Sequence, residues 1–243
     1  MRHDGPLRSR VLLVMGRALA NLVAATLRQG PYETRGATEP AAWRALIRDW
    51  DPQLALVDID HHDAFLDADI GRPQGRIPVL AFTRRRDTSV RLSAFERGAD
   101  DIVEVPFTLD EIIARPFALM RRVHGVTAPL VPRLTIGGEI EIDLRARTVT
   151  LDGGRALELT PIQQTLLYLL AASAGEVLTR ETLLATIWGS AVQIESNVVD
   201  RHIRELRVKL GDDWRTPRYI ETVSGHGYRF RVRESGMEDA AAQ

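Results

Sequence analysis

The sequence predicts an α/β protein: a domain with a doubly wound parallel sheet, followed by a winged helix-turn-helix domain. Short apolar runs alternate with amphipathic stretches over the first half of the chain, an order typical of a parallel sheet covered by helices on both faces. Three amphipathic stretches follow one another in the second half. A β-rich segment with glycines at its centre comes after them and predicts a hairpin.

In the first half, buried strands are predicted where the chain is apolar nearly throughout: 11–15, 54–58 and 79–83, with a further short strand at Val103. Helices are predicted where apolar residues recur at helical spacing: 18–28, 41–49, 88–97 and 109–123. Pro116 interrupts the last helix, which costs about 3 kcal/mol unless a kink accommodates it. Sheets of this kind place their functional residues at the carboxyl ends of the strands.

The second half begins with three short strands at 134–136, 139–143 and 148–152. Thr160 caps the first helix, which has Pro161 at its first position, and Thr179 caps the second helix, 180–188. The third helix runs from Ser196 or Asn197 to Leu210, before Gly211. The expected parts of the chain are the α/β domain, a linker, the winged helix-turn-helix domain and a tail: 9–124, 125–132, 133–233 and 234–243.

Composition excludes several classes of protein. The chain of 243 residues is 44% hydrophobic and 27% charged, which is a globular profile, and it contains no cysteine for a disulfide or a thiolate nucleophile. The N-terminus lacks the apolar core of a signal peptide, and the longest apolar runs are far short of a bilayer span. We therefore expect a cytoplasmic protein with no membrane contact. No nucleophile–base pair, phosphate-binding loop or metal-ligand spacing indicates an enzyme or a cofactor.

The formal net charge is −1, yet the segment from Ser196 to Arg233 is basic. Its cations outnumber its acidic residues: Arg201, Arg204, Arg207, Lys209, Arg215, Arg218, Arg229, Arg231 and Arg233 against Asp200, Glu205, Asp212, Asp213 and Glu221. A local basic surface on a balanced chain is what contact with nucleic-acid phosphates requires.

The third helix divides into two faces. One is a buried stripe of Val198, Val199, Ile203, Leu206 and Leu210. The opposite face offers polar residues: Asn197, Arg201, His202, Arg204, Glu205 and Arg207. Such a helix fits the DNA major groove, where arginine suits guanine, asparagine suits adenine and glutamate can accept from cytosine. The alternative is an amphipathic helix that merely faces water.

Five blocks in order and spacing resemble the effector domain of OmpR/PhoB-type response regulators: Leu159-Thr160-Pro161, Leu178-Thr179-Arg180-Glu181, Ile187-Trp188-Gly189, Val199-Asp200-Arg201-His202-Ile203-Arg204 and Gly225-His226-Gly227-Tyr228-Arg229-Phe230. The resemblance covers about Arg133 to Arg233. It implies a transcription regulator that binds double-stranded promoter DNA. It also implies that the loop at 189–195 contacts RNA polymerase.

The resemblance assigns DNA contacts residue by residue. Arg180 and Trp188 match positions that hold the phosphate backbone, although Trp188 could equally pack in the core. The wing and its flanks supply the remaining candidates: Thr222, Ser224, His226, Tyr228, Arg229 and Arg231. Glu205 stands where the family usually has arginine, Arg201 where it has valine, and Ser224 where it has a wing arginine. Gln163 and Gln164 replace glutamate and phenylalanine, which we expect to change packing more than DNA contact.

The first half resembles a receiver domain, a flavodoxin-like fold, over about Ser9 to Arg122. Asp58 matches the phosphoacceptor and Thr83 the switch threonine. The acidic pair that would hold Mg²⁺ is replaced by Met15 and Gly16, the phosphate-binding lysine by Val105, and the aromatic switch residue by Ile102. Because one carboxylate cannot hold Mg²⁺ well, we expect Asp58 to be a vestigial phosphoacceptor and Thr83 a vestigial switch residue.

Asp58 then needs a counter-charge, and Arg17 and Arg84 follow the neighbouring strands. We expect a salt bridge to one of them, the alternative being an exposed Asp58. The cluster at 60–63 (Asp-His-His-Asp) is not expected to bind metal, because adjacent loop residues rarely converge on one ion. The resemblance also implies a homodimer through the receiver-like domain, with Asp100, Asp101 and Arg115 at its face.

Three functions remain open at this point. The leading hypothesis is an orphan-like, atypical regulator that works without phosphorylation. The second is an ordinary two-component regulator controlled by phosphorylation. The third, of another class, is a sensor whose receiver-like half binds a small ligand or a partner protein.

Overall fold

The computed structural model describes residues 8–68, 75–125, 133–136, 140–143, 148–151, 154–189 and 197–232. The larger parts of the expected linker and of the loop at 189–195, and the tail at 234–243, lie outside these residues. Within the described ranges, no helix is both long enough and apolar enough to cross a bilayer.

The N-terminal half (8–125) is built on a five-stranded parallel sheet of order β2-β1-β3-β4-β5. Its strands are β1 (Ser9–Val14), β2 (Tyr32–Gly36), β3 (Leu54–Asp58), β4 (Val79–Thr83) and β5 (Asp101–Glu104). Its helices are α1 (Arg17–Leu27), α2 (Pro40–Trp50), the short α3 (Ile59–His62) with the 3-10 turn η1 (Asp63–Phe65), α4 (Thr88–Glu96) and α5 (Leu109–His124). The doubly wound parallel sheet is confirmed.

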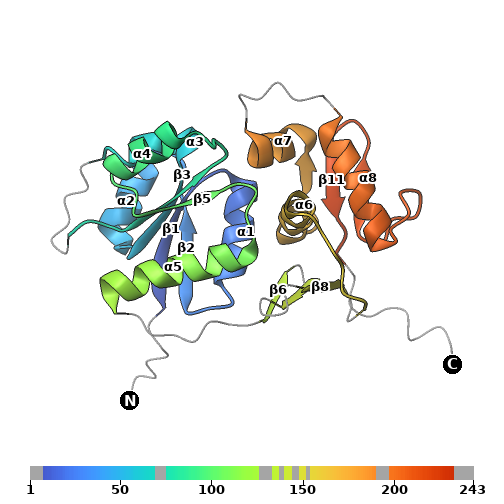
Figure 1. The fold of residues 1–243 in the computed structure, drawn as a ribbon, viewed down its shortest axis with the longest axis horizontal. Helices are drawn as coiled ribbons and strands as arrows, with labels where there is room; N and C mark the ends of the chain where they lie inside the picture. The colour runs from blue at the N-terminus through green and yellow to red at the C-terminus, as the bar shows by residue number, and fades with distance from the viewer. Residues whose placement is uncertain are drawn as a thin grey trace, which may run out of the picture.

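Alternation along the strands divides this half into two apolar layers. Val11, Leu13 and Phe82 face one side, where α1 and α5 cover them. Leu12, Val14 and residues beside them face the other side, beneath α2 and α4. Helices therefore cover both faces of the sheet (Figure 1). Helix α5 runs from Leu109 to His124 and includes the buried Pro116, so the predicted helix forms in spite of this proline.

The C-terminal half (133–232) has the winged-helix architecture that the sequence predicts. A small antiparallel sheet, β6 (Arg133–Ile136), β7 (Ile140–Asp143) and β8 (Thr148–Leu151), comes first. The helices are α6 (Pro161–Ala172), α7 (Arg180–Trp188) and α8 (Val198–Leu210). The last sheet, of order β10-β11-β9, joins β9 (Val177–Thr179), β10 (Ile220–Val223) and β11 (Gly227–Phe230).

Local capping explains where α6 and α7 begin and where α8 ends. The Thr160 side chain accepts from the backbone N–H of Gln163, and Thr179 does the same for Thr182. Gly211 ends α8 in the left-handed conformation at φ 64°, which glycine adopts without strain. These caps confirm the predicted starts of α6 and α7 and the end of α8.

The two halves meet along α1 and α6 (Figure 1), and a continuous apolar core includes residues of both. Polar contacts border this junction. Asn21 Nδ2 donates to Ser173 Oγ at 3.1 Å, and Arg17 pairs with Glu176 at 2.5 Å. Helix α8 lies on the side of the C-terminal half that is turned away from the N-terminal half (Figure 1). The junction therefore leaves α8 uncovered.

Gly227 allows β9 and β11 to approach closely. A Cβ atom at this position would lie 2.1 Å from the carbonyl oxygen of Leu178 and 2.8 Å from the Cα of Thr179. We expect Gly227→Ala to lower the free energy of unfolding by about 1–3 kcal/mol, because the backbone of β9 must move. Urea unfolding measures the loss. Gly16→Ala is the control, since a Cβ there meets nothing within 4 Å, and equal stabilities of the two variants would contradict the expectation.

Candidate functional site

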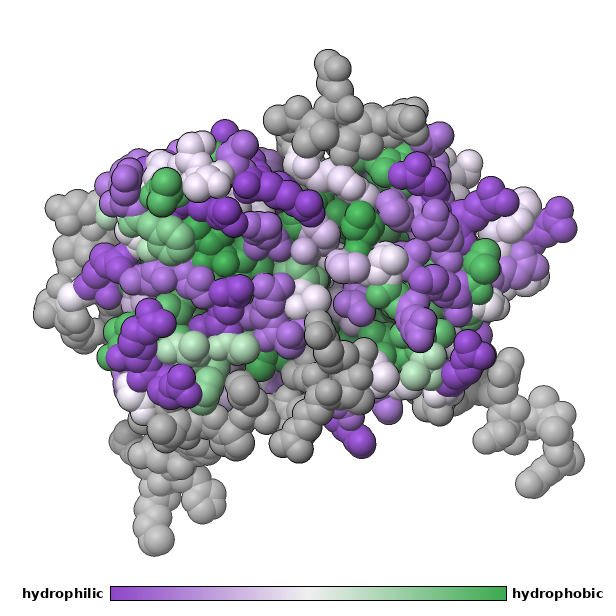
Figure 2. Space-filling view, in the orientation of Figure 1, coloured by the Kyte–Doolittle hydropathy of each residue, from purple (hydrophilic) through white to green (hydrophobic). Residues whose placement is uncertain are grey.

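The outward face of α8 carries two arginines whose side chains have no partner among the residues that the structure describes. Val199, Ile203 and Leu206 are buried on the inner face. Arg201 and Arg204 are exposed on the opposite face, and the side chain of neither makes an ion pair or hydrogen bond within the described residues. The surface over α8 is mostly hydrophilic (Figure 2). Two unpaired guanidinium groups on one helix face suit contacts with an external anion or with guanine edges.

Arg180, Asp200 and Tyr228 form a cluster that joins α7, α8 and β11. Arg180 Nε donates to Asp200 Oδ1 at 2.8 Å, and its guanidinium lies 4.9 Å from the centre of the Tyr228 ring. The hydrogen bond to Asp200 raises the pKa of Arg180. Burial raises the pKa of Tyr228 to about 12, so its hydroxyl stays protonated at neutral pH and donates to Asp200. The cluster therefore links α7, α8 and the wing through side-chain contacts.

Two residues expected on the outward face of α8 point elsewhere, which corrects the sequence analysis. Arg207 donates to the Ile220 carbonyl at 2.6 Å and to Thr222 Oγ1 at 2.9 Å, so it fastens the wing to α8. The His202 side chain is only 15% exposed and stacks on Trp188, with ring centres 5.6 Å apart. Helix geometry explains both positions, because the two residues lie at the edges of the apolar stripe. Trp188 packs against the core as well.

The wing holds its charges through contacts within the chain. Arg229 pairs with Glu221 across the two strands at 2.9 Å, and Arg231 donates to the carbonyl of Pro217. At the tip, His226 Nδ1 lies 2.9 Å from the Ser224 carbonyl oxygen. The tip and Thr222 are exposed, and Tyr228 is buried.

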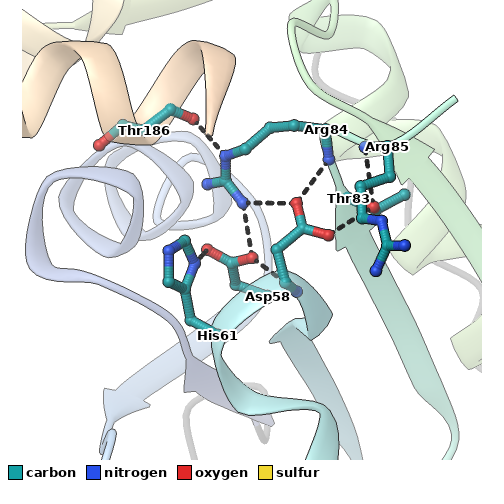
Figure 3. A network of polar contacts seen from close by, with 7 residues as sticks. Asp58, His61, Thr83, Arg84, Arg85 and Thr186 are labelled. Atoms are coloured by element: carbon teal, nitrogen blue, oxygen red, sulfur yellow. Dashed lines mark hydrogen bonds and ion pairs between the residues drawn. The ribbon is translucent and has the colours of Figure 1, made fainter. Parts of the chain in front are cut away.

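A second polar site lies at the carboxyl end of β3. Asp58 Oδ1 and Arg84 Nη1 are 2.6 Å apart, and each side chain is 3% exposed (Figure 3). His61 Nδ1 lies 3.3 Å from the other Asp58 oxygen. This arrangement gives the expected salt bridge, with Arg84 as the partner. Arg17 instead pairs with Glu176.

The side chain of Asp60, the second residue of α3, points into the same site. Its Oδ1 accepts from the Thr83 hydroxyl at 2.7 Å, and its Oδ2 accepts from the Arg84 backbone N–H at 2.7 Å. Arg84 Nη1 lies 3.2 Å from the same Oδ2. This second carboxylate was not predicted, because the Asp-His-His-Asp pattern at 60–63 indicated only a possible metal cluster. The sequence signal that could have indicated it is an acidic residue, Asp60, two positions after the aspartate that ends the strand.

Arg84 also reaches the C-terminal half. Its Nε donates to the carbonyl oxygen of Thr186 in α7 at 2.7 Å (Figure 3). One guanidinium group therefore contacts two carboxylates of the N-terminal half and the backbone of a helix in the other half. The pocket at Asp58 is closed by the chain itself.

Comparisons with known proteins identify the family. Residues 154–230 match the family model described as "Transcriptional regulatory protein, C terminal". The chain is 31% identical to the DNA-binding response regulator MtrA of Mycolicibacterium smegmatis over 226 residues, covering 92% of this chain and 97% of MtrA. The chain belongs to the OmpR/PhoB family of response regulators.

Other members of this family are also similar. The response regulator PmrA of Pseudomonas aeruginosa is 39% identical over 158 residues, which cover 65% of this chain and 67% of PmrA. Among solved structures, DrrB, an OmpR/PhoB homologue from Thermotoga maritima, is 26% identical and covers 93% of this chain and 99% of its own, with a TM-score of 0.40. MtrA is named a DNA-binding response regulator and PmrA a response regulator, which agrees with the prediction of a regulator in place of an enzyme.

The pocket does not fit the Mg²⁺ ion that receiver domains of the OmpR/PhoB family use. Mg²⁺ requires several oxygen ligands in octahedral geometry. Met15 and Val105 are buried apolar side chains, and Gly16 has no side chain. The carboxylates of Asp58 and Asp60 are already bound to the Arg84 cation. The remaining oxygens of this pocket cannot complete a magnesium site.

The residues expected at the dimer face are engaged within the chain. Asp100 accepts from the backbone N–H of Val79 at 2.7 Å, and Asp101 pairs with Arg115 at 2.8 Å. Arg115 also lies 3.1 Å from Glu111 one turn away.

Over the described part of the chain, no group of three or more histidine, aspartate or glutamate residues is placed to hold a metal ion.

Proposed function

We propose that this OmpR/PhoB-type regulator binds specific promoter DNA through α8 and its wing, and that it does so without phosphorylation of Asp58. The observation that carries the proposal is the buried pairing of Asp58 with Arg84. An aspartate that accepts a phosphoryl group must be open to the donor and to a metal ion. The carboxylate of Asp58 instead contacts the guanidinium group of Arg84.

The donors that would stabilise an incoming phosphoryl group are also occupied. The hydroxyl of Thr83 and the backbone N–H of Arg84 both donate to Asp60, each at 2.7 Å. A phosphoryl group on Asp58 would have to displace the Asp60 carboxylate from these donors and break a buried ion pair. The carboxylate of Asp60 thus occupies, at the end of β4, the place where the oxygens of a phosphoryl group would bind.

The DNA-binding part of the proposal is supported by charge and position. Arg201 and Arg204 are exposed and unpaired within the described residues, and α8 lies away from the junction of the two halves. The relative MtrA is named a DNA-binding response regulator. Binding as proposed therefore requires no separation of the two halves.

The remaining assignments belong to the same proposal. They are the division into domains at 9–124 and 133–233, a contact of the loop at 189–195 with RNA polymerase, and a homodimer through the receiver-like domain. Apolar side chains at the surface of α4 support the dimer, since Leu92 is 57% and Phe95 47% exposed. Apolar surface is visible over the α4 region in Figure 2.

Incubation with acetyl phosphate and Mg²⁺ tests phosphorylation independence. We expect the intact mass of the protein and its affinity for promoter DNA to stay unchanged, because Arg84 and Asp60 occupy the site. An ordinary phosphorylated member of the family, treated in parallel, is the positive control. A stable phosphoryl adduct on Asp58 that increases DNA affinity would refute the proposal.

A further inference from the structure

A buried amide on α6 touches a carboxylate on α8. Gln163 is 3% exposed, and its Nε2 donates to Glu205 Oε2 at 3.2 Å. Its Oε1 accepts from the backbone N–H of Thr160 at 3.1 Å, within the capping box of α6. Because a backbone N–H can only donate, this second bond fixes which end of the amide faces Glu205. Gln163 is therefore held in one orientation and presents a donor to α8.

Glu205 is held on one side and open on the other. Its Oε2 receives the Gln163 amide and lies 3.5 Å from His202 Nδ1. His202 is itself stacked on Trp188. The Oε1 atom of Glu205 has no hydrogen-bond partner within the described residues, and the side chain is 48% exposed. One carboxylate oxygen is thus fixed, and its twin faces outward from the helix that carries Arg201 and Arg204.

A carboxylate on a DNA-facing helix is repelled by phosphates, so it is useful there only where it meets a donor. In the major groove, the exocyclic amino groups of cytosine and adenine are the donors, whereas guanine presents only the acceptors O6 and N7. A freely rotating glutamate would lose side-chain entropy on binding. Gln163 removes much of this cost because it already restrains Glu205.

We propose that Glu205 selects cytosine at one position of the DNA site and that Gln163 is the positioning residue that makes this selection possible. The inference rests on the proposed binding of specific DNA and goes beyond it, because it names a base class and the residue that sets it. It also replaces the expectation that Gln163 affects packing more than DNA contact.

The test determines the preferred DNA site by selection from random duplexes and then measures relative affinities for all four bases at each position. The unchanged protein is expected to prefer cytosine at one position by about 5-fold to 150-fold, the range for one good base contact. Gln163→Met is expected to reduce that preference to about threefold or less, with preferences elsewhere retained. Gln164→Met, the same change at the next residue, is the matched control and keeps the preference.

Exchanging donor and acceptor separates positioning from general stability. In Glu205→Gln the new carbonyl accepts from Gln163, so an NH₂ group faces the base and the cytosine preference is lost. In Gln163→Glu/Glu205→Gln the NH₂ group donates to the new carboxylate, so a carbonyl oxygen faces the base and the cytosine preference returns. A merely structural role of Gln163 predicts no such return.

The outcomes distinguish the two proposals. Cytosine selection that survives in Gln163→Met, or that fails to return in the double variant, overturns the role of Gln163. Unchanged preferences at every position in Glu205→Gln, with binding still sequence-specific, overturn the role of Glu205 and leave the proposed function standing. If the unchanged protein selects no DNA sequence at all, the proposed function is itself refuted.

Discussion

Replacing Asp58 with alanine is expected to lower the free energy of unfolding by about 3–5 kcal/mol. The change leaves the guanidinium of Arg84, which is 3% exposed, without its nearest counter-charge at 2.6 Å. The loss should fall toward the lower end of this range, because Asp60 Oδ2 remains 3.2 Å from the same nitrogen. Urea unfolding, followed by circular dichroism, measures the difference.

An exposed ion pair provides the control for Asp58→Ala. Asp49 pairs with Arg48 at 2.8 Å, with the two side chains 62% and 72% exposed, and Asp49→Ala should cost about 1 kcal/mol or less. The double variant Asp58→Ala/Arg84→Met should regain part of the loss, since no unpaired charge then stays buried. An Asp58→Ala protein as stable as Asp49→Ala would show that the pair is solvated in solution.

Replacing Arg201 and Arg204 together with alanine is expected to weaken binding to the selected DNA site about 30-fold or more. Each arginine that meets a base contributes roughly 1–3 kcal/mol. Neither is committed to a partner within the described residues, so both are available to DNA. Fluorescence anisotropy at one fixed salt concentration measures the loss, because affinities for DNA depend steeply on salt.

The same measurement on an unrelated duplex shows whether the loss is specific. If the arginines read bases, affinity for the unrelated duplex should fall much less than affinity for the selected site. Arg48→Ala removes an exposed arginine of α2 in the other half and should leave both affinities unchanged. Equal losses on both duplexes would limit Arg201 and Arg204 to phosphate contacts.

Local signals in the sequence predicted much of the fold. Helices α6 and α7 begin where Thr160 and Thr179 indicate, because a cap depends only on residues within one turn. Strands β2 and β9 were not predicted. Strand β2 has the polar sequence Tyr-Glu-Thr-Arg-Gly at the edge of its sheet, and the three residues of β9 form a strand only by pairing with β11. Neither carries an apolar run of its own.

The polar sites depend on contacts between segments far apart in the chain. The sequence could limit the number of candidate partners for a residue but could not identify the partner. Arg17 and Arg84 both follow strands that flank the strand of Asp58. Arg84 pairs with Asp58, whereas Arg17 pairs with Glu176 of the other half at the junction. The contact between Gln163 and Glu205 joins residues 42 positions apart. Helix periodicity placed Glu205 on the outer face of α8 and gave no information about the amide beside it.

The bond from Arg84 to the Thr186 carbonyl has a consequence for how a cell would control this regulator. In a switchable receiver, the amount of active protein is set by a kinase and changes within one molecule's lifetime. If this regulator works without phosphorylation, as we propose, a kinase has no such control here, because the Arg84 side chain that pairs with Asp58 also bonds the backbone of α7. Promoter occupancy then follows the ratio of protein concentration to dissociation constant, by mass action. Synthesis and degradation of the chain become the means of control, and its own promoter becomes a natural place to look for the site that it binds.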